Sequence, residues 1–256
     1  MSFGSFQDQV KSALIVESFA ESQATGLKVG RLEIWPVGLM SGEQSREAIL
    51  SSKFDLVVVR YPAADFEFAQ GLTSPLLQSL QADTLMYYEF RDCRDINAQE
   101  RVDLQLRELS EGDVSILDSL IPRVFGGYKN HYSSNPLFES IDVTDAYLRW
   151  TNSCLNQRNI SVLIASEPRL GEVGICVLDE ISPDYAEILL AGIVSEARRQ
   201  GIYSDMIRKI LARVSLRESG TVVISTQAAN IEVTRAWCRL GFLPIRALNT
   251  VHVWKV

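Results

Sequence analysis

The segment that decides the fold is IVSEARRQGIY, residues Ile193–Tyr203. It begins at the end of the apolar run Ile188–Val194, whose composition is that of a buried strand, and it leads through a basic, glycine-containing turn into a helix that we predict over Tyr203–Leu216. At such a junction backbone N–H groups and the positive end of the helix dipole converge, and Arg198 and Arg199 add charge. The segment therefore suits a bound anion.

The same segment has a plainer interpretation, a solvated turn in which Gly201 ends one element before the helix begins. A glycine would also let the backbone approach a ligand more closely than a residue with a Cβ atom allows. The segment alone does not separate the two interpretations, so the choice depends on the elements around it.

The elements around this junction have the periodicities of a mixed α/β protein. Three of the strands before it are joined by short links, which favour antiparallel neighbours. In chain order we predict a strand over Leu104–Arg107, a helix capped by Asp113, a helix over Val143–Cys154, strands over Ile160–Ala165, Glu172–Leu178, Ala186–Val194 and Thr221–Thr226, a helix over Ile231–Leu240 and a closing strand or hairpin over Leu243–Val256.

A polar stretch, Arg91–Arg101, interrupts the apolar patterning. We place a domain boundary at residues 92–102, between a first domain of residues 1–98 and a second of residues 99–256. The first domain also alternates strand and helix. Its predicted elements are strands over Arg31–Trp35, Leu56–Val59 and Thr84–Phe90, a helix opened by a capping box at Ser41 and Gln44, and a helix with Leu72, Leu76, Leu77 and Leu80 at helical spacing.

The composition excludes some classes of protein. The 256 residues are 46% hydrophobic and 22% charged, which is typical of a folded globular chain. A formal net charge of −7 argues against a broad nucleic-acid-binding surface, because phosphate backbones are bound by clustered lysine and arginine. The cysteines and histidines are scattered, so we expect a reducing compartment and no protein-bound metal. They are Cys93, Cys154, Cys176, Cys238, His131 and His252.

The start of the sequence, Met1–Asp8, has neither the basic region nor the apolar core of a signal peptide. The longest unbroken apolar run, Ile188–Val194, is far shorter than the roughly 20 residues that span a bilayer. The sequence therefore predicts a cytoplasmic protein that does not have a membrane as partner.

The order of segments from residue 104 to residue 256 resembles the GNAT superfamily of N-acetyltransferases. The turn motif of that superfamily, Q/R-x-x-G-x-G/A, matches Arg198-x-x-Gly201-x-Tyr203, with a tyrosine where the pattern has a small residue. Asn230, followed by a helix and by Gly241–Phe242, matches its second conserved segment.

A closer likeness is to TDP-fucosamine acetyltransferase and related enzymes that N-acetylate nucleotide-linked amino-deoxy sugars. Those enzymes carry a truncated GNAT-like half before the catalytic half, as residues 1–98 would be here. The other matching features are Thr226–Gln227 before Asn230, the loop with His131–Tyr132, Asn135–Pro136 and Phe138, and the pair Tyr147 and Trp150.

The resemblance implies a GNAT fold, an α/β protein with a mixed, mostly antiparallel sheet flanked by helices and a smaller α/β domain before it. It also implies transfer of the acetyl group of acetyl-CoA to the amine of a nucleotide-linked, TDP-linked by preference, amino sugar, with no metal. The cofactor-binding positions that it implies are Ile193, Val194, Arg198, Arg199, Gln200, Gly201, Ile202, Tyr203, Ser204, Asn230 and Trp237.

For the substrate, aromatic side chains with polar tips and paired amides suit a sugar. The same polar loop could instead satisfy its own turns, and that alternative stays open. The substrate-binding residues that we expect are Tyr128, His131, Tyr132, Asn135, Thr226 and Gln227.

Three residues are candidates for a catalytic role. A protein base, if one acts, is expected at Glu187 or His131. Members of the superfamily commonly protonate the leaving thiolate from a tyrosine seven residues after the asparagine, and Trp237 holds that position here. An indole N–H is a donor but no useful acid, so we expect Trp237 to pack along the cofactor arm. His252 is expected to be structural.

Three alternatives remain at this point. The chain could acetylate a different small molecule, it could acetylate a protein amine, or it could bind coenzyme A without turnover. A truncated first half also leaves a sheet edge that a second copy could cover, which would make a homodimer.

Overall fold

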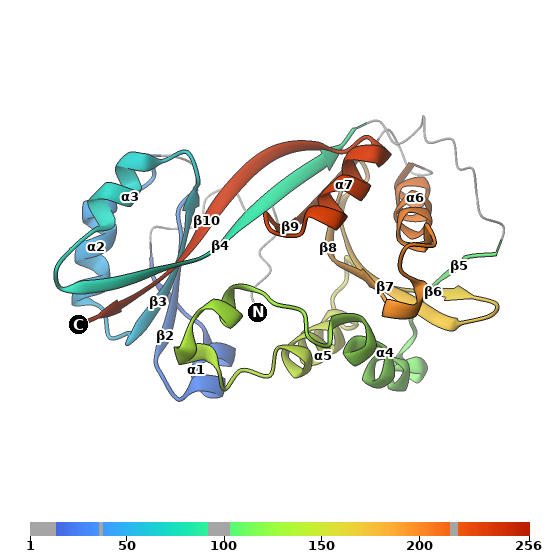
Figure 1. Ribbon diagram of the computed structural model, residues 1–256, viewed down its shortest axis with the longest axis horizontal. Helices are drawn as coiled ribbons and strands as arrows, with labels where there is room; N and C mark the ends of the chain where they lie inside the picture. Colours follow the sequence, from blue (N-terminus) through green and yellow to red (C-terminus); the bar gives the residue numbers. More distant parts are fainter. Residues whose placement is uncertain (1–13, 36–37, 92–102, 216–219) are drawn as a thin grey trace.

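The structure is a computed structural model that describes residues 14–35, 38–91, 103–215 and 220–256. The stretch at which we place the domain boundary lies outside these residues, and the division at residue 98 stays a prediction. The described strands form one ten-stranded sheet in the order β1-β2-β3-β10-β4-β9-β8-β7-β6-β5 (Figure 1). They are β1 (Val16–Glu17), β2 (Val29–Glu33), β3 (Leu56–Pro62), β4 (Leu77–Phe90), β5 (Gln105–Glu108), β6 (Ile160–Glu167), β7 (Gly171–Ser182), β8 (Tyr185–Ile193), β9 (Thr221–Gln227) and β10 (Leu243–Lys255).

The helices cover both faces of this sheet (Figure 1). In the larger part, α4 and α5 lie on one face, whereas α6 and α7 lie on the other. The predicted meander of β6, β7 and β8 is confirmed as antiparallel. The helices are α1 (Phe19–Thr25), α2 (Gly42–Ser51), α3 (Phe66–Leu72), α4 (Ser115–Phe125), α5 (Val143–Cys154), α6 (Ile202–Ser215) and α7 (Ile231–Leu240), with short 3-10 turns at η2 (Glu111–Asp113), η3 (His131–Ser134), η4 (Pro136–Phe138) and η5 (Ser195–Ala197).

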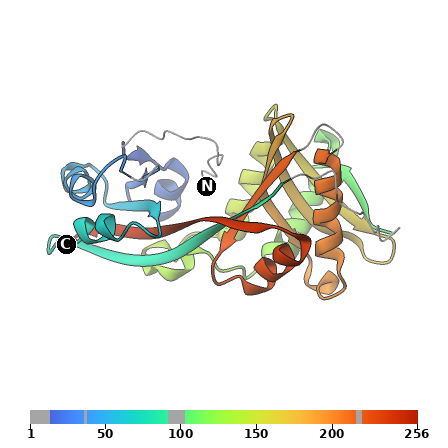
Figure 2. The same ribbon diagram turned by 90° about the horizontal axis from the view of Figure 1, so that it is seen from above.

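The two halves of the chain exchange strands. The long strand β4 of the first half lies between β9 and β10, and β10 at the end of the chain lies between β4 and β3. Figure 2 shows β4 and β10 running side by side from one part of the molecule into the other. Each half therefore completes the sheet of the other.

A buried polar network adds a second link between the halves. Arg31 on β2 pairs with Glu21 of α1, and the Tyr132 hydroxyl in η3 donates to Glu21 Oε1 at 2.5 Å. Arg31 also donates to the Tyr132 hydroxyl at 3.1 Å. Because these groups are buried and mutually satisfied, η3 is held firmly against the first half.

Two local predictions are wrong. The leucine spacing predicted a helix through Leu80, but α3 ends at Leu72 and β4 begins at Leu77. Pairing with the long strand β10 decides the conformation of this segment. The hydrogen bonds and side-chain contacts of that pairing outweigh the helical preference of the leucine spacing. Asp113 does not cap α4 either; it lies in η2, where its carboxylate binds Arg107 and the Ser110 hydroxyl.

The remaining elements agree with the sequence patterns. The capping box at Ser41 and Gln44 is present at the start of α2, and α5, α6 and α7 lie where the apolar periodicity predicts them. The sheet ends at β1 and β5, which are 2 and 4 residues long. A homodimer through such an edge stays a prediction.

Candidate active site

A wedge opens in the sheet where β8 and β9 separate. The two strands pair in parallel from Tyr185 and Thr221 as far as Ile188 and Ile224, and beyond these residues β8 pairs only with β7, while β9 pairs with β4. The edge of β8 that follows Ile188 is therefore open to a ligand that can pair with a strand.

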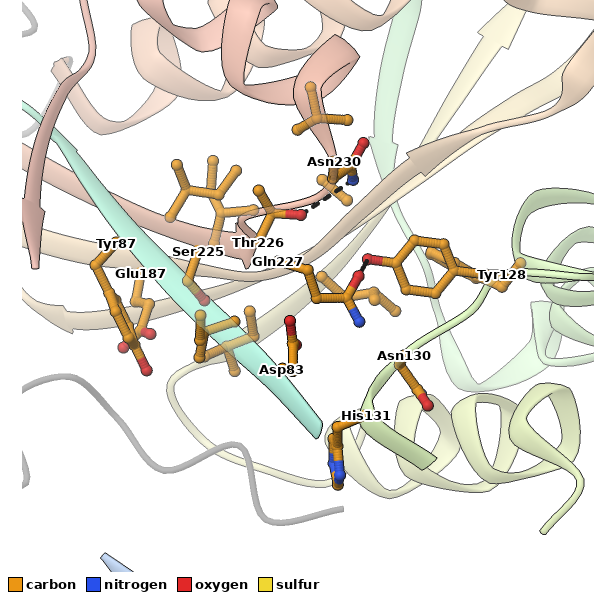
Figure 3. A pocket seen from close by; sticks show the side chains of 18 of the residues that line it. Asp83, Tyr87, Tyr128, Asn130, His131, Glu187, Ser225, Thr226, Gln227 and Asn230 are labelled. Atoms are coloured by element: carbon orange, nitrogen blue, oxygen red, sulfur yellow. Dashed lines mark hydrogen bonds between the residues drawn. The ribbon is translucent and has the colours of Figure 1, made fainter. Parts of the chain in front are cut away.

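A cavity fills this wedge and extends toward the first half of the chain (Figure 3). Leu189, Leu190 and Ala191 of β8 form part of its apolar wall, together with Val233 of α7. Its polar or ionisable side chains are Arg31, Arg60, Asp83, Tyr87, Tyr128, Asn130, His131, Tyr147, Glu187, Tyr203, Ser225, Thr226, Gln227, Asn230 and Trp237.

The turn after β8 follows directly on the open strand edge, although its residues do not line the main cavity. Arg199 and Gly201 both have positive φ, 60° and 80°, a strained conformation for the arginine and an easy one for the glycine. The turn leads into α6, whose first N–H groups have no acceptor within the helix. A smaller hollow beside it shares Tyr128, Gln227 and Asn230 with the main cavity. It is also lined by Lys129 and Arg198, so its mouth favours an anion.

Trp237 is buried, and its indole N–H already donates a hydrogen bond within the protein. The ring contacts Tyr88 edge-on, with centroids 5.4 Å apart, and its Nε1–H donates to the Tyr203 hydroxyl at 3.0 Å. Tyr203 stands at the position where the superfamily pattern has a small residue, and its ring lines the wedge. Burial raises the pKa of Tyr203, so its hydroxyl keeps its own hydrogen to donate.

Glu187 lies near the base of the wedge and is 3% exposed. Its charge acts on Tyr87 and Tyr185, and burial with that neighbouring carboxylate raises the pKa of Tyr87 to about 12. Arg246 of β10 also lies within electrostatic range of Glu187. A buried carboxylate on a cavity wall can accept a proton or hold a cationic group.

A hydrogen-bonded chain on β9 orders the opposite wall (Figure 3). The Tyr128 hydroxyl donates to Gln227 Oε1 at 2.5 Å, which leaves the amide nitrogen of Gln227 to donate to Asp83. Asn230 Nδ2 donates to Thr226 Oγ1 at 3.0 Å and makes no side-chain cap on α7. Asn230 therefore braces the end of β9 beside the cavity.

His131 also lines the cavity, and its partner is the other histidine of the chain. His131 Nδ1 lies 3.0 Å from His252 Nε2, and His252 Nδ1 lies 3.2 Å from Asn135 Nδ2. Burial, with the nearby charges of Arg60 and Arg31, holds the pKa of His131 well below its usual value and lowers the pKa of His252 to about 4. Both rings are therefore neutral at pH 7.

Several predicted site residues do not line the main cavity. The Tyr132 hydroxyl belongs to the network of Glu21 and Arg31, and the Asn135 side chain binds His252 and the Leu137 N–H. The other predicted residues outside it are Ile193, Val194, Arg198, Arg199, Gln200, Gly201, Ile202 and Ser204, which form the end of β8, the turn and the start of α6. Arg198 lines the smaller hollow instead.

The residues that sequence reasoning missed come from the first half of the chain. Asp83 and Tyr87 project from β4 into the cavity, and Arg60 of β3 lies nearby. Burial raises the pKa of Asp83, although the Thr84 N–H and Arg60 oppose that effect. No local motif marks these positions, because only the strand exchange brings β4 next to β9.

The described residues contain no group of three or more histidine, cysteine, aspartate or glutamate side chains placed to hold a metal ion. Among the helices of the same residues, none is long and apolar enough to cross a membrane.

Comparison with known proteins identifies the fold. No protein-family model and no curated protein sequence matches the chain. A solved structure of a functionally unknown conserved protein from Staphylococcus epidermidis is similar over 96% of this chain and 93% of its own, with a TM-score of 0.64 and 13% identity.

Two N-acetyltransferase structures are also similar. The GCN5-related N-acetyltransferase from Sphaerobacter thermophilus has a TM-score of 0.58 and 15% identity over 78% of this chain and 59% of its own. The corresponding values for the GCN5-related N-acetyltransferase from Kribbella flavida are 0.52 and 11%, over 88% and 81%. The chain therefore has the fold of the GCN5-related N-acetyltransferases, and the predicted fold class, a mixed α/β sheet flanked by helices, is confirmed.

Proposed function

We propose that this protein is an N-acetyltransferase that uses acetyl-CoA. The observation that carries the proposal is the wedge between β8 and β9, which has an open strand edge along one side and the Gly201 turn at its end. A pantetheine arm is an extended chain with two amides, so it can pair with such an edge, and a pyrophosphate suits the N–H groups at the start of α6.

The residues present fit that cosubstrate. Tyr203 replaces a small residue of the superfamily pattern, yet its ring lies against the wedge wall with its hydroxyl bound by Trp237, and the cavity remains open beside both rings. Lys129 and Arg198 supply positive charge at the mouth. When bound, acetyl-CoA supplies a thioester whose acetyl carbon an amine can attack.

The side chains of this protein then have separate roles. Backbone N–H groups of β8 around Leu190–Ile193 hold the carbonyl oxygen as charge develops on it. Glu187 takes a proton from the acceptor amine, either directly or through water. The Tyr203 hydroxyl, positioned by the Trp237 N–H, gives a proton to the departing sulfur.

For the acceptor we propose a small polar amine such as a nucleotide-linked amino-deoxy sugar. The wall formed by Tyr128, Gln227 and Asp83 offers hydroxyl, amide and carboxylate groups within one hydrogen-bonded chain, which suits a molecule with several hydroxyls and one amine. The test is thiol release from acetyl-CoA with TDP- and UDP-linked amino sugars, compared with a lysine-containing peptide. Saturable release with a sugar supports the proposal, and release with the peptide alone contradicts it.

Replacing Gly201 by valine is expected to raise the Kd for acetyl-CoA at least about tenfold, roughly 1.4 kcal/mol. Its φ of 80° is unfavourable for a β-branched residue, and the new side chain would occupy the turn that faces the pyrophosphate. The measurement is calorimetric titration of the folded variant with acetyl-CoA.

The matched control for this prediction is Gly171→Val. Gly171 has a similar φ of 72°, but it is the first residue of β7 and has open space around it. It should lose comparable stability while keeping its affinity for acetyl-CoA. Unchanged affinity in a folded Gly201→Val protein would exclude the proposed cosubstrate site.

A further inference from the structure

The hydrogen bonds around the two histidines fix which ring nitrogen carries hydrogen. Asn135 Oδ1 accepts the Leu137 N–H at 3.0 Å, which settles the orientation of this amide, so its Nδ2 donates to His252 Nδ1. A neutral imidazole has one donor and one acceptor. His252 therefore carries its hydrogen on Nε2.

The same argument applies to the ring of His131. His252 Nε2–H donates to His131 Nδ1 across 3.0 Å, so His131 Nδ1 is an acceptor and its hydrogen lies on Nε2. Packing keeps both rings in place, with His131 against Tyr132 at 4.0 Å between centroids and Phe138 against His252 at 4.8 Å. Nε2 of His131 is the ring nitrogen directed away from His252.

We infer that His131 acts in the cavity as a hydrogen-bond donor that positions an oxygen of the acceptor substrate, and that it is not the general base. Its Nε2 already bears a hydrogen, so it has no lone pair there to take a proton from an amine. Arg60 and Arg31 lie within electrostatic range of His131, together with His252. An N–H donor suits an oxygen acceptor and not a cationic amine, which has no lone pair to accept the hydrogen.

This inference rests on the proposed function only for the identity of the bound oxygen. It resolves the choice between the two predicted bases, since Glu187 is the one of those two that can accept the proton. It also assigns a role to His252 and Asn135. From outside the cavity, their hydrogen bonds fix the tautomer of His131 that carries its hydrogen on Nε2. They are positioning residues that touch no substrate.

The hydrogen positions can be tested without any substrate. The chain contains two histidines, so protein labelled with ¹⁵N-histidine has four ring nitrogens to resolve, and His131→Phe assigns them. Long-range ¹H–¹⁵N spectra at pH 7 should show both Nε2 atoms bearing hydrogen and both Nδ1 atoms bare. A bare Nε2 on His131, or an imidazolium on either ring, would overturn the inference.

Kinetics test the role of the ring. With TDP- and UDP-linked amino sugars as acceptors, His131→Phe should raise the KM for the acceptor about tenfold and change kcat by only a few-fold. The substitution removes a hydrogen bond that positions the acceptor, but it does not remove the general base. Ser133→Ala is the matched control, since it removes an exposed hydroxyl from the same η3 turn outside the main cavity and should leave both constants unchanged.

The opposite pattern would overturn the inference. A fall in kcat of about 10²-fold or more for His131→Phe, with KM unchanged, would mean that the ring transfers a proton. An unchanged KM with unchanged kcat would reduce the histidine pair to a structural brace. Should the unmodified protein acetylate none of the acceptors, the proposed function fails, while the spectra still decide the hydrogen positions.

Discussion

Replacing Glu187 by glutamine is expected to lower kcat for acetyl transfer by about 10²–10⁴-fold, the usual contribution of a general base. The amide keeps the size of the carboxylate but cannot accept a proton at neutral pH. Because Glu187 lies on the cavity wall rather than in the turn, the Kd for acetyl-CoA should change little. The measurement is the rate of thiol release at saturating acetyl-CoA and acceptor.

The control for this variant is Asp184→Asn. Asp184 is an exposed carboxylate three positions earlier, in the turn that precedes β8, and its substitution removes the same charge without touching the cavity. Its kcat should match that of the unmodified protein. A loss of less than about tenfold in folded Glu187→Gln would show that the carboxylate only organises Tyr87, Tyr185 and Arg246.

Removing the Tyr203 hydroxyl is the second substitution with a large expected effect. Tyr203→Phe should lower kcat by about 10²-fold, because the group that protonates the leaving sulfur is lost while the ring keeps its place in the wedge. The affinity for acetyl-CoA should stay within a few-fold, so the effect should lie in kcat and not in KM.

Trp237→Phe separates the two candidate proton donors. It removes the Nε1–H that holds the Tyr203 hydroxyl but retains much of the ring volume against Tyr88, so most of kcat should remain. The reverse result, a large loss of kcat in Trp237→Phe and little loss in Tyr203→Phe, would assign the transferred hydrogen to the indole. Circular dichroism and a thermal unfolding curve for both variants would exclude a loss of fold.

The sequence predicted the second half of the fold more completely than the first. Strands β6 to β9 and helices α5 to α7 have short links and clear apolar periodicity, so local patterns were enough. The prediction of a helix through Leu80 is wrong because the conformation of this segment depends on pairing with β10, far along the chain. Local patterns carry no information about such a partner.

The residues of the candidate site also fall into two groups, those that local patterns predict and those that only the fold brings together. The turn with Gly201, the Tyr203 position and Trp237 could be found because they lie within one continuous strand–turn–helix pattern or at a fixed distance from Asn230. Asp83 could not, since it enters the cavity only through the exchange of strands. The link between His131 and His252 likewise joins two distant segments.

The exchange of strands also constrains how the chain folds during synthesis. Strands β3 and β4 leave the ribosome well before Leu248, which pairs with both Pro62 and Leu85. Until then both strands have an unpaired edge, the kind of surface that favours aggregation and chaperone binding. Pairing over such long sequence separation is slow, and it joins both halves into one cooperative unit. A ribosome-stalled chain that ends before Leu243 should therefore remain open to protease in its first half, although every residue of that half has already been made.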